Sequence, residues 1–402
     1  MFTLNSGQSF VVREAVKWFY DTNSTQVFQF DGPPGSGKSV VLNEIIKELG
    51  LDPLTEIAAM SFIGSASLVM RMKGLMNAKT AHSWIYDIQS VPARDKDGKI
   101  LMDNLMNVPI RVPKFIPIEF LDPNIKLIVI DEAYSMPRKM RPTIEKFGIK
   151  IIACGDQGQL PPVNDEPAFL VDGNIYHLTE IMRQIGREDI NYITERVRNG
   201  LPLLNGFYGN TLVIDYEDLN DKMLIWADMV ICCKNSTRDY FNNRIRNLLG
   251  YTSKLPQFGE KVVCRKNNWL EGIQLDNGST VNLVNGLIGT VTNSPDISSY
   301  DGNLFSLDFC PDLVPSITFQ NCRCNYKHMI SDFNTRNTIR NNRYETGNMF
   351  EFAYAITDHI AQGSQWHNVV YIEERMPQDI QQNLNTVGAS RPDQFLIYVK
   401  PK

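Results

Sequence analysis

A glycine-rich octapeptide, GPPGSGKS at residues 32–39, contains residue types suited to binding phosphate groups. Glycine lets the backbone curl so that several N–H groups point at one anion, and the N-terminus of a following helix adds partial positive charge. In such a loop Lys38 reaches the β- and γ-phosphates of a nucleoside triphosphate, and the hydroxyl of Ser39 is a ligand for Mg²⁺. The pattern therefore predicts a nucleotide triphosphatase whose phosphate-binding residues are Gly32, Pro33, Pro34, Gly35, Ser36, Gly37, Lys38 and Ser39.

Two adjacent acidic residues supply the chemistry that the loop lacks. Asp131 and Glu132 directly follow the apolar run LIVI at 127–130. An aspartate at a strand end can hold Mg²⁺, and the neighbouring glutamate can orient or deprotonate an attacking water. An acidic pair after an apolar run is weak evidence alone, but its place after a phosphate-binding loop favours hydrolysis.

A second polar string, GDQGQLPPV at residues 155–163, also begins where a predicted strand ends. Its polar side chains, Asp156 and Gln159, are expected beside the nucleotide because ligands bind at the carboxyl ends of parallel strands. Gln159 is placed to sense the γ-phosphate and to pass its presence to a second binding surface.

Four short apolar runs must position these residues. Each run ends where polar residues of the candidate site begin, which is typical of an open parallel sheet in an α/β fold. After the phosphate loop, apolar residues recur at helical spacing and Gly50 follows, so we expect a helix over 38–49. The four runs are VFQFD (27–31), EIAAMS (56–61), KLIVI (126–130) and KIIAC (150–154).

The sequence changes character between Trp84 and Pro123. Five prolines, at positions 92, 109, 113, 117 and 123, exclude a long helix there. The alternation over residues 110–120 predicts a small hairpin excursion.

A second α/β unit is predicted from about Ala227. The run ADMVICC precedes a helix for which Ser236 and Asp239 resemble a capping box and which ends at Gly250. The unit resumes at Phe350 with the strand candidates FEFAYAIT, NVVYI and QFLIYV. Between them lie short β-rich pieces, GEKVVCRKNN, LIGTV, LFSLDF and SITFQ, which indicate a small inserted barrel.

Composition bounds the class of protein. A chain of 402 residues, 43% hydrophobic and 21% charged, is typical of a globular protein with two or three domains. It contains no apolar run near the length of a membrane span and no secretory leader, so we expect a cytoplasmic protein. The net charge of −5 excludes a global basic field for nucleic acid.

Local groups of residues leave further alternatives open. Basic stretches at Lys261, Arg265 and Lys266, and at Arg336, Arg340 and Arg343, are either solvated faces or local contacts to a phosphate backbone. The seven cysteines indicate reduced thiols rather than a disulfide framework. A zinc site at Cys310, Cys322, Cys324 and His328 lacks the usual paired C-x₂-C spacing, and the segment has the pattern of barrel strands.

The combined motifs resemble those of superfamily 1 helicases. In addition to the loop, the acidic pair and GDQGQLPPV, the resemblance covers LNSGQ (4–8), HLTEIMRQ (177–184), the segment 354–374 and VGASRPDQFLIYV (387–399). Within that superfamily the chain is most similar to the 5′-to-3′ subgroup of RecD-type and phage Dda-type helicases. That likeness rests on GEKVVCRKNNW (259–269) and LVNGLIGTV (283–291), which look like the subgroup's inserted SH3-like barrel.

The resemblance implies an α/β fold with two RecA-like P-loop domains that contain parallel sheets. The first RecA-like domain would comprise residues 1–83 and 124–225, with a pin-bearing excursion at 84–123. The second would comprise residues 226–255 and 350–402, with an SH3-like β-barrel insertion at 256–349.

The resemblance also assigns roles to single residues. Gln8 would read adenine, Gly363 would lie at the nucleotide, and Arg183 and Arg391 would approach the γ-phosphate from opposite sides of a cleft. The chain has Arg391–Pro392 where the family usually has Arg–Ala, Phe62–Ile63 where small residues are common, and Ile360–Ala361 where a basic residue is usual. The expected contacts to a single strand are Phe62, His82, Ser83, Thr357, His359 and Gln362.

The expected function is an ATP- and Mg²⁺-dependent DNA helicase that translocates 5′ to 3′ on single-stranded DNA. Its partners would be single-stranded DNA, duplex junctions and replication or recombination proteins, it would not bind a membrane, and it would act as a monomer. The alternative is a nucleic-acid-stimulated ATPase that remodels protein–DNA complexes without processive unwinding. The motifs do not distinguish translocation alone from unwinding, nor do they show whether DNA or RNA is the substrate.

Overall fold

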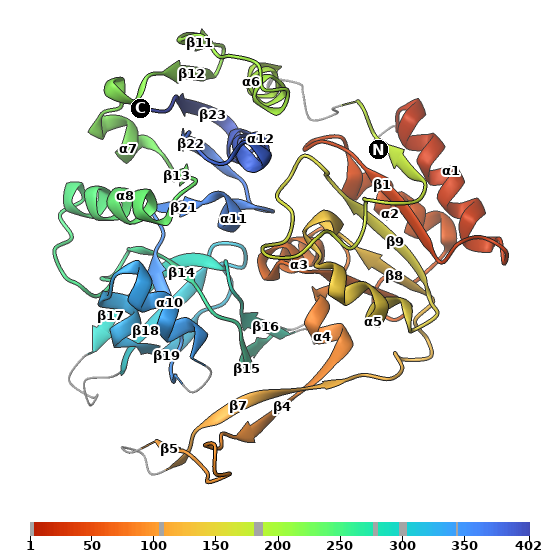
Figure 1. Ribbon diagram of the computed structural model, residues 1–402, viewed down its shortest axis with the longest axis horizontal. Helices are drawn as coiled ribbons and strands as arrows, with labels where there is room; N and C mark the ends of the chain where they lie inside the picture. The colour runs from red at the N-terminus through yellow and green to blue at the C-terminus, as the bar shows by residue number, and fades with distance from the viewer. Residues whose placement is uncertain (1–3, 104–107, 181–187, 276–279, 297–303, 343–344) are drawn as a thin grey trace. The chain divides into compact units, whose positions relative to one another are not determined.

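The computed structural model describes residues 4–103, 108–180, 188–275, 280–296, 304–342 and 345–402. The chain divides into two compact units, and three separate segments of sequence form the first (Figure 1). The first unit comprises Met1–Ile85, Ile118–Cys233 and Thr357–Lys402, and the second comprises Tyr86–Pro117 and Lys234–Ile356.

A parallel six-stranded sheet forms one core of the first unit, with strand order β10-β1-β9-β8-β2-β3. Buried apolar residues from both faces support it, as expected for strands covered on both sides. The four strands expected from apolar runs are confirmed. The strands are β1 (Val27–Asp31), β2 (Ile57–Ser61), β3 (Lys79–Thr80), β8 (Leu127–Ile130), β9 (Lys150–Gly155) and β10 (Ile175–His177).

Helices and short 3₁₀ turns follow these strands. Helix α2 spans the predicted residues and stops at Gly50, whose φ of 64° is left-handed and therefore suits glycine. Helix α1 packs against α2. The elements are α1 (Ser6–Tyr20), α2 (Lys38–Leu49), α3 (Gly64–Met72), α4 (Ala81–Ile85), η1 (Ala133–Ser135), η2 (Arg138–Met140) and α5 (Arg141–Glu145).

The second sheet of the first unit has the order β11-β12-β23-β22-β13-β21. The last strand in the sequence, β23, lies between β12 and β22 and pairs with both in parallel. Helix α6 packs against α12 in this half. The elements are α6 (Glu188–Arg198), β11 (Gly206–Tyr208), β12 (Thr211–Ile214), η3 (Tyr216–Asp218), α7 (Asp221–Trp226), β13 (Met229–Cys232), β21 (Ala355–Thr357), α11 (Asp358–Ala361), β22 (Trp366–Ile372), α12 (Gln378–Ala389) and β23 (Pro392–Val399).

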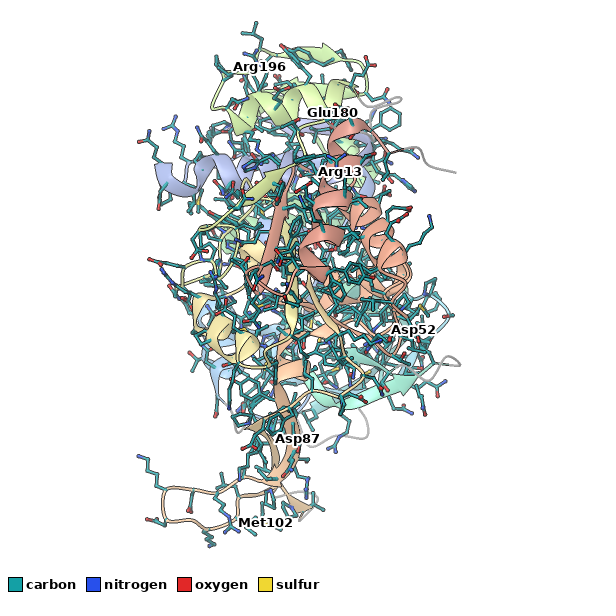
Figure 2. The ribbon with its side chains drawn as sticks, turned by 90° about the vertical axis from the view of Figure 1, so that its right-hand side faces the viewer. Arg13, Asp52, Asp87, Met102, Glu180 and Arg196 are labelled. Carbon is teal, nitrogen blue, oxygen red and sulfur yellow. The ribbon has the colours of Figure 1, made fainter. Side chains whose placement is uncertain are left out.

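The second unit contains the expected hairpin and a β-rich region. Strand β4 (Tyr86–Pro92) pairs antiparallel with β7 (Arg111–Pro117), and the short strands β5 (Met102–Asp103) and β6 (Val108–Pro109) pair within the same excursion. Figure 2 labels Asp87 on β4 and Met102 on β5 along this hairpin.

The β-rich region is built on a five-stranded antiparallel sheet of order β19-β18-β17-β14-β20. A two-stranded ribbon, β15–β16, and three helices accompany it. The inserted β-region is thereby confirmed, while its likeness to an SH3 barrel and the bounds of the four domains stay predictions. The elements are α8 (Asn235–Leu248), β14 (Lys261–Cys264), β15 (Asn268–Gln274), β16 (Thr280–Leu283), β17 (Ile288–Asp296), β18 (Leu304–Pro311), β19 (Phe319–Asn325), α9 (Tyr326–Ile330), α10 (Phe333–Asn341) and β20 (Phe350–Phe352).

Two local expectations are wrong. Helix α8 begins at Asn235 with Lys234 as its N-cap and no capping side chain, because Asp239 instead accepts hydrogen bonds from Arg238. The run FEFAYAIT is not one strand, since β20 pairs antiparallel with β14 while β21 joins the second sheet of the first unit.

The cysteine-rich segment shows no metal geometry in the part of the chain that the structure describes. No group of three or more His, Cys, Asp or Glu side chains is placed there to hold a metal ion. The buried thiols of Cys322 and Cys324 in β19 donate to the carbonyls of Phe319 at 3.5 Å and Cys322 at 3.2 Å, and the Cys310 thiol lies 3.7 Å from the Pro315 carbonyl. Among the same described residues, no helix is long and apolar enough to cross a membrane.

A buried ion pair joins α8 to the start of the β-rich region. Nε of Arg246 lies 2.6 Å from one carboxylate oxygen of Glu260, Nη2 lies 3.1 Å from the other, and the Glu260 side chain is fully buried. The guanidinium also stacks on the Phe352 ring, 3.7 Å from its centroid. Removing either partner would leave the other charge buried without a counter-ion, so we expect the loss of either residue to destabilise the fold.

Replacing Glu260 with alanine should lower the free energy of unfolding by about 3–5 kcal/mol, because Arg246 would remain buried without its counter-ion. The matched control is Asp312→Ala, which breaks the partly exposed Lys261–Asp312 pair, 2.7 Å apart, and should cost less than about 1 kcal/mol. Urea titration followed by tryptophan fluorescence measures both. Equal losses in the two variants would contradict the importance of the buried pair.

Candidate functional site

The glycine-rich loop has the conformation that its sequence predicts. Gly35 and Gly37 have φ of 88° and 83°, in the left-handed region that favours glycine. A Cβ atom at Gly32 would lie 2.4 Å from the Ser36 hydroxyl and 2.9 Å from the Leu178 carbonyl oxygen, so the loop closes only around glycine. No side chain caps α2 at its N-terminus, which leaves that helix end to an anion.

Polar atoms of the loop fit a triphosphate. The Lys38 ammonium donates to the carbonyl oxygens of Gly32 at 2.7 Å and Pro33 at 3.3 Å, at the mouth of the loop. The buried Ser36 hydroxyl has no hydrogen-bond partner in the described part of the chain. A buried hydroxyl without a partner is costly, and a phosphate oxygen would satisfy it.

Gln8 lies against the loop rather than in open solvent. Its amide nitrogen donates to the Ser36 carbonyl at 2.9 Å, and its backbone and side chain form a capping box with Asn5. The Gln8 amide also occupies the space beside Gly37, where a Cβ atom would lie 2.4 Å from it. Gln8 therefore supports the phosphate loop, and its reading of adenine stays a prediction.

The acidic pair lies at the end of β8. Glu132 has a left-handed φ of 52°, which turns the chain sharply after the strand, and its backbone N–H donates to Asp131 Oδ1 at 2.9 Å. Burial, followed by the charge of Asp131, raises the pKa of Glu132 to about 7, while Lys38 and Arg391 oppose the shift. A carboxylate with this pKa suits a general base near neutral pH.

Arg391 is close enough to Glu132 to influence its pKa, so the structure brings Lys38, Glu132 and Arg391 into one region of the first unit. The arginine is 4% exposed, and its guanidinium donates to the Val387 carbonyl at 2.9 Å and to the Ser390 hydroxyl at 2.8 Å. Arg183, expected to approach from the other side, lies outside the described residues.

Gln159, in the loop that follows β9 of the first sheet, contacts the part of the first unit that contains the second sheet. Its side-chain oxygen accepts a hydrogen bond from Gln362 at 3.0 Å, and its backbone carbonyl accepts one from Asn383 of α12 at 2.5 Å. Both glutamines are 3% exposed. Gln362, expected on the single strand, therefore bonds Gln159 directly, and Asn383 is a contact that the sequence motifs did not reveal.

The other residues expected at a single strand lie near the tips of strands. The Phe62 and His82 rings approach within 5.8 Å between centroids, and the hydroxyls of Ser83 and Thr80 lie 3.0 Å apart. Thr357 is buried at the start of α11, and His359 is exposed. Gly363 has a φ of 82° and would place a Cβ atom 3.4 Å from Ala66 of α3.

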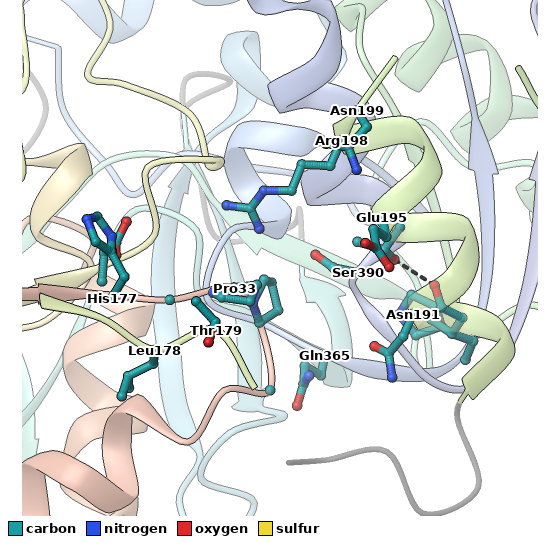
Figure 3. Close-up of a pocket in the computed structure, with 17 residues that line it drawn as sticks. Pro33, His177, Leu178, Thr179, Asn191, Glu195, Arg198, Asn199, Gln365 and Ser390 are labelled. Atoms are coloured by element: carbon teal, nitrogen blue, oxygen red, sulfur yellow. Dashed lines mark hydrogen bonds and ion pairs between the residues drawn. The ribbon is translucent and has the colours of Figure 1, made fainter. Parts of the chain in front are cut away.

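A pocket of about 590 Å³ lies beside the phosphate loop (Figure 3). Residues 31–35 and 177–179 line one side, and α6, Ser390 and Pro392 line the other. Arg198 projects into it from α6, and His177 Nδ1 pairs with Asp31 at 2.5 Å. No motif marks Arg198, and only the helical spacing of Ile190, Thr194 and Val197 indicates which face of α6 is buried. His177 and Asp31 each belong to a motif or run found in the sequence, but their pairing was not predicted.

Comparison with known protein families identifies the class of this site. The family model described as AAA domain matches residues 3–209, which include the phosphate loop, the acidic pair and Gln159.

The chain belongs to the AAA domain family. The phosphate loop and the half-buried Glu132 at the end of β8 both lie within the part of the chain that the family model matches. A curated relative, Uncharacterized protein R530 of Acanthamoeba polyphaga mimivirus, is 26% identical over 286 residues. That match covers 60% of this chain and 56% of the relative, so the chain spans little more than half of that protein.

Solved structures show which architecture this AAA family member has. Pif1 helicase from Candida albicans is 18% identical, with a TM-score of 0.55 over 99% of this chain and 94% of that chain. Bacteroides Pif1 bound to ssDNA is 15% identical, with a TM-score of 0.55 over 99% and 92%. Bacteroides Pif1 in complex with ADP-AlF3 and ssDNA is 16% identical, with a TM-score of 0.54 over 99% and 92%. The chain therefore shares the fold of these solved structures, and the expected α/β fold with parallel sheets is confirmed.

The buried Asp358, the first residue of α11, lets us predict how the free energy of unfolding depends on pH. Burial raises the pKa of Asp358, which lies near the Cys233 thiol, well above its ordinary value. A folded-state pKa above the unfolded one gives stability that is complete below the unfolded pKa and is lost as the pH rises. Asp358→Asn should therefore stabilise the fold above about pH 4, with a gain that grows by up to about 1.4 kcal/mol per pH unit.

Urea denaturation at several pH values measures this gain. The exposed Asp379→Asn is the control and should follow the wild-type pH profile. If the Asp358→Asn and wild-type profiles run parallel, Asp358 is not held neutral by its burial.

Proposed function

We propose that the chain is an ATP-dependent motor that translocates 5′ to 3′ on single-stranded DNA and unwinds duplex DNA. The observation that carries the proposal is the hydrogen bond of 3.0 Å between Gln159 and Gln362. It joins a residue of the string GDQGQLPPV (155–163), which follows β9, to the segment that the helicase resemblance assigns to the strand. A change at the γ-phosphate therefore has a direct structural route to the nucleic-acid surface.

The roles at the nucleotide follow from the geometry. Lys38 would leave the loop carbonyls for the phosphates, and Glu132 would accept a proton from the attacking water. The hydroxyl of Ser39 and the carboxylate of Asp131 are hard oxygen donors that suit Mg²⁺, which when bound would neutralise phosphate charge. The Ser39 hydroxyl accepts a hydrogen bond from Lys73 at 3.2 Å, a contact that Mg²⁺ would replace.

The proposed strand contacts combine aromatic rings with neutral hydrogen-bonding groups, as a sequence-tolerant surface requires. Phe62 and His82 offer a pair of adjacent rings, and burial lowers the pKa of His82, which favours its neutral form. Bacteroides Pif1, whose fold this chain shares, is bound to ssDNA in its solved structure. The hairpin β4–β7 would split the duplex.

Strand displacement with tailed duplexes tests this function. The protein should unwind a duplex with a 5′ single-stranded tail and leave a 3′-tailed duplex largely intact. Lys38→Ala is the control for ATP dependence and should abolish unwinding while single-strand binding persists, because the strand contacts use other residues.

The outcomes separate the alternatives. Unwinding of the 3′-tailed duplex would overturn the assigned polarity. DNA-stimulated ATP hydrolysis without displacement of either strand would favour the remodelling ATPase. Unchanged hydrolysis by Lys38→Ala would reject the assigned nucleotide site.

Arg391 should act as an arginine finger. Arg391→Ala should bind single-stranded DNA nearly as well as wild type and should lose DNA-stimulated hydrolysis by roughly 3 to 5 powers of ten. Arg375→Ala, which removes an exposed arginine of the same half, is the matched control. Steady-state ATPase rates with and without oligonucleotide measure the effect, and full DNA stimulation in Arg391→Ala would exclude the finger role.

A further inference from the structure

A carboxylate lies buried next to the nucleotide pocket. Asp156 is 1% exposed, and its Oδ1 atom accepts hydrogen bonds from the Gly158 N–H at 2.8 Å and from Arg198. Its Oδ2 atom is buried and has no hydrogen-bond partner among the described residues. Burying a carboxylate is costly unless an opposite charge is paired with it.

Arg198 supplies that charge from α6. Its guanidinium lies on the face of Gly158, where a Cβ atom would be 2.2 Å from Nη2 and 2.5 Å from Cζ. Glycine at position 158 is therefore what lets the guanidinium reach Asp156. The same side chain lines the pocket beside Pro33 and Pro34 of the phosphate loop (Figure 3).

Other acidic residues lie near Asp156, and their combined negative charge would repel an anionic ligand. Burial raises the pKa of Asp31, the residue before the loop, and the charge of Asp156 contributes to that rise. Asp156 also contributes, after burial and Asp131, to the raised pKa of Glu132. Among the described residues, the carboxylates around the loop include Asp31, Asp131, Glu132 and Asp156, and the cations near them include Lys38, Arg198 and Arg391.

We propose that Arg198 is a positioning residue for ATP: it neutralises Asp156 on the Gly158 surface so that the acidic pocket accepts the phosphates. Without Arg198, the negative charge of Asp156 faces both the neighbouring acids and the incoming triphosphate. The inference rests on the proposed function, because it takes this pocket as the ATP site.

Binding of a fluorescent, non-hydrolysable ATP analogue in the presence of Mg²⁺ tests the proposal. Arg198→Ala should weaken binding by roughly tenfold to one hundredfold, as expected for one uncompensated charge near a phosphate group. Gly158→Ala should weaken it similarly, because the methyl group takes the place of the guanidinium. Adding Asp156→Asn to Arg198→Ala should restore the affinity to within roughly threefold of wild type.

Controls separate this role from a merely structural one. Arg196→Ala removes an arginine of the same helix that bonds the Pro202 carbonyl and stacks on Tyr192, and it should bind the analogue like wild type. Urea denaturation without nucleotide establishes that each variant is folded.

Each outcome decides one question. Wild-type affinity in Arg198→Ala, or failure of Asp156→Asn to restore binding, would overturn the charge-compensation role and leave the proposed function intact. If wild type itself does not bind the analogue, the proposed function fails instead.

Discussion

Parallel strand pairing in the first sheet is the constraint on which the site depends. The register places Asp31 opposite Gly155 and Ile130 opposite Ala153, so the chain leaves neighbouring strands at the same edge. The phosphate loop, the acidic pair and the Asp156 turn are far apart in sequence, and only this register makes them neighbours. A slip in register by one residue would exchange the side chains on the two buried faces and disturb the packing on both, so the register is strongly specified.

Several carboxylates surround the pocket that we propose binds the polyanion ATP. The cations described there are each held in a defined position by neighbouring groups. Lys38 is held by loop carbonyls, Arg198 by a carboxylate, and Arg391 by a carbonyl and a hydroxyl. None of these three is a loosely solvated charge. Such pre-arranged cations lose little orientational freedom when a ligand binds, so more of the electrostatic attraction contributes to affinity.

Sequence patterns predicted the first sheet well because its strands are buried on both faces and read as apolar runs. Helix α2 was predicted to the residue, since its loop and Gly50 mark both ends. The start of α8 was mispredicted because Asp239 bonds arginines instead of the helix N-terminus, a choice made by tertiary contacts. Arg198 and Asn383 escaped notice for a related reason, since their partners are distant in sequence and neither belongs to a motif.

The place of β23 has a consequence for how the protein is made. This strand, residues 392–399, lies between β12 and β22, so the second sheet lacks an interior strand until these residues have been synthesised. Arg391 immediately precedes it. A ribosome-bound chain can form the phosphate loop early, yet it has no fixed arginine to complete the site. The interleaved chain order thus leaves the site without Arg391 and β23 until residues 391–399 have been translated, and a nascent fragment that ends before them lacks this arginine.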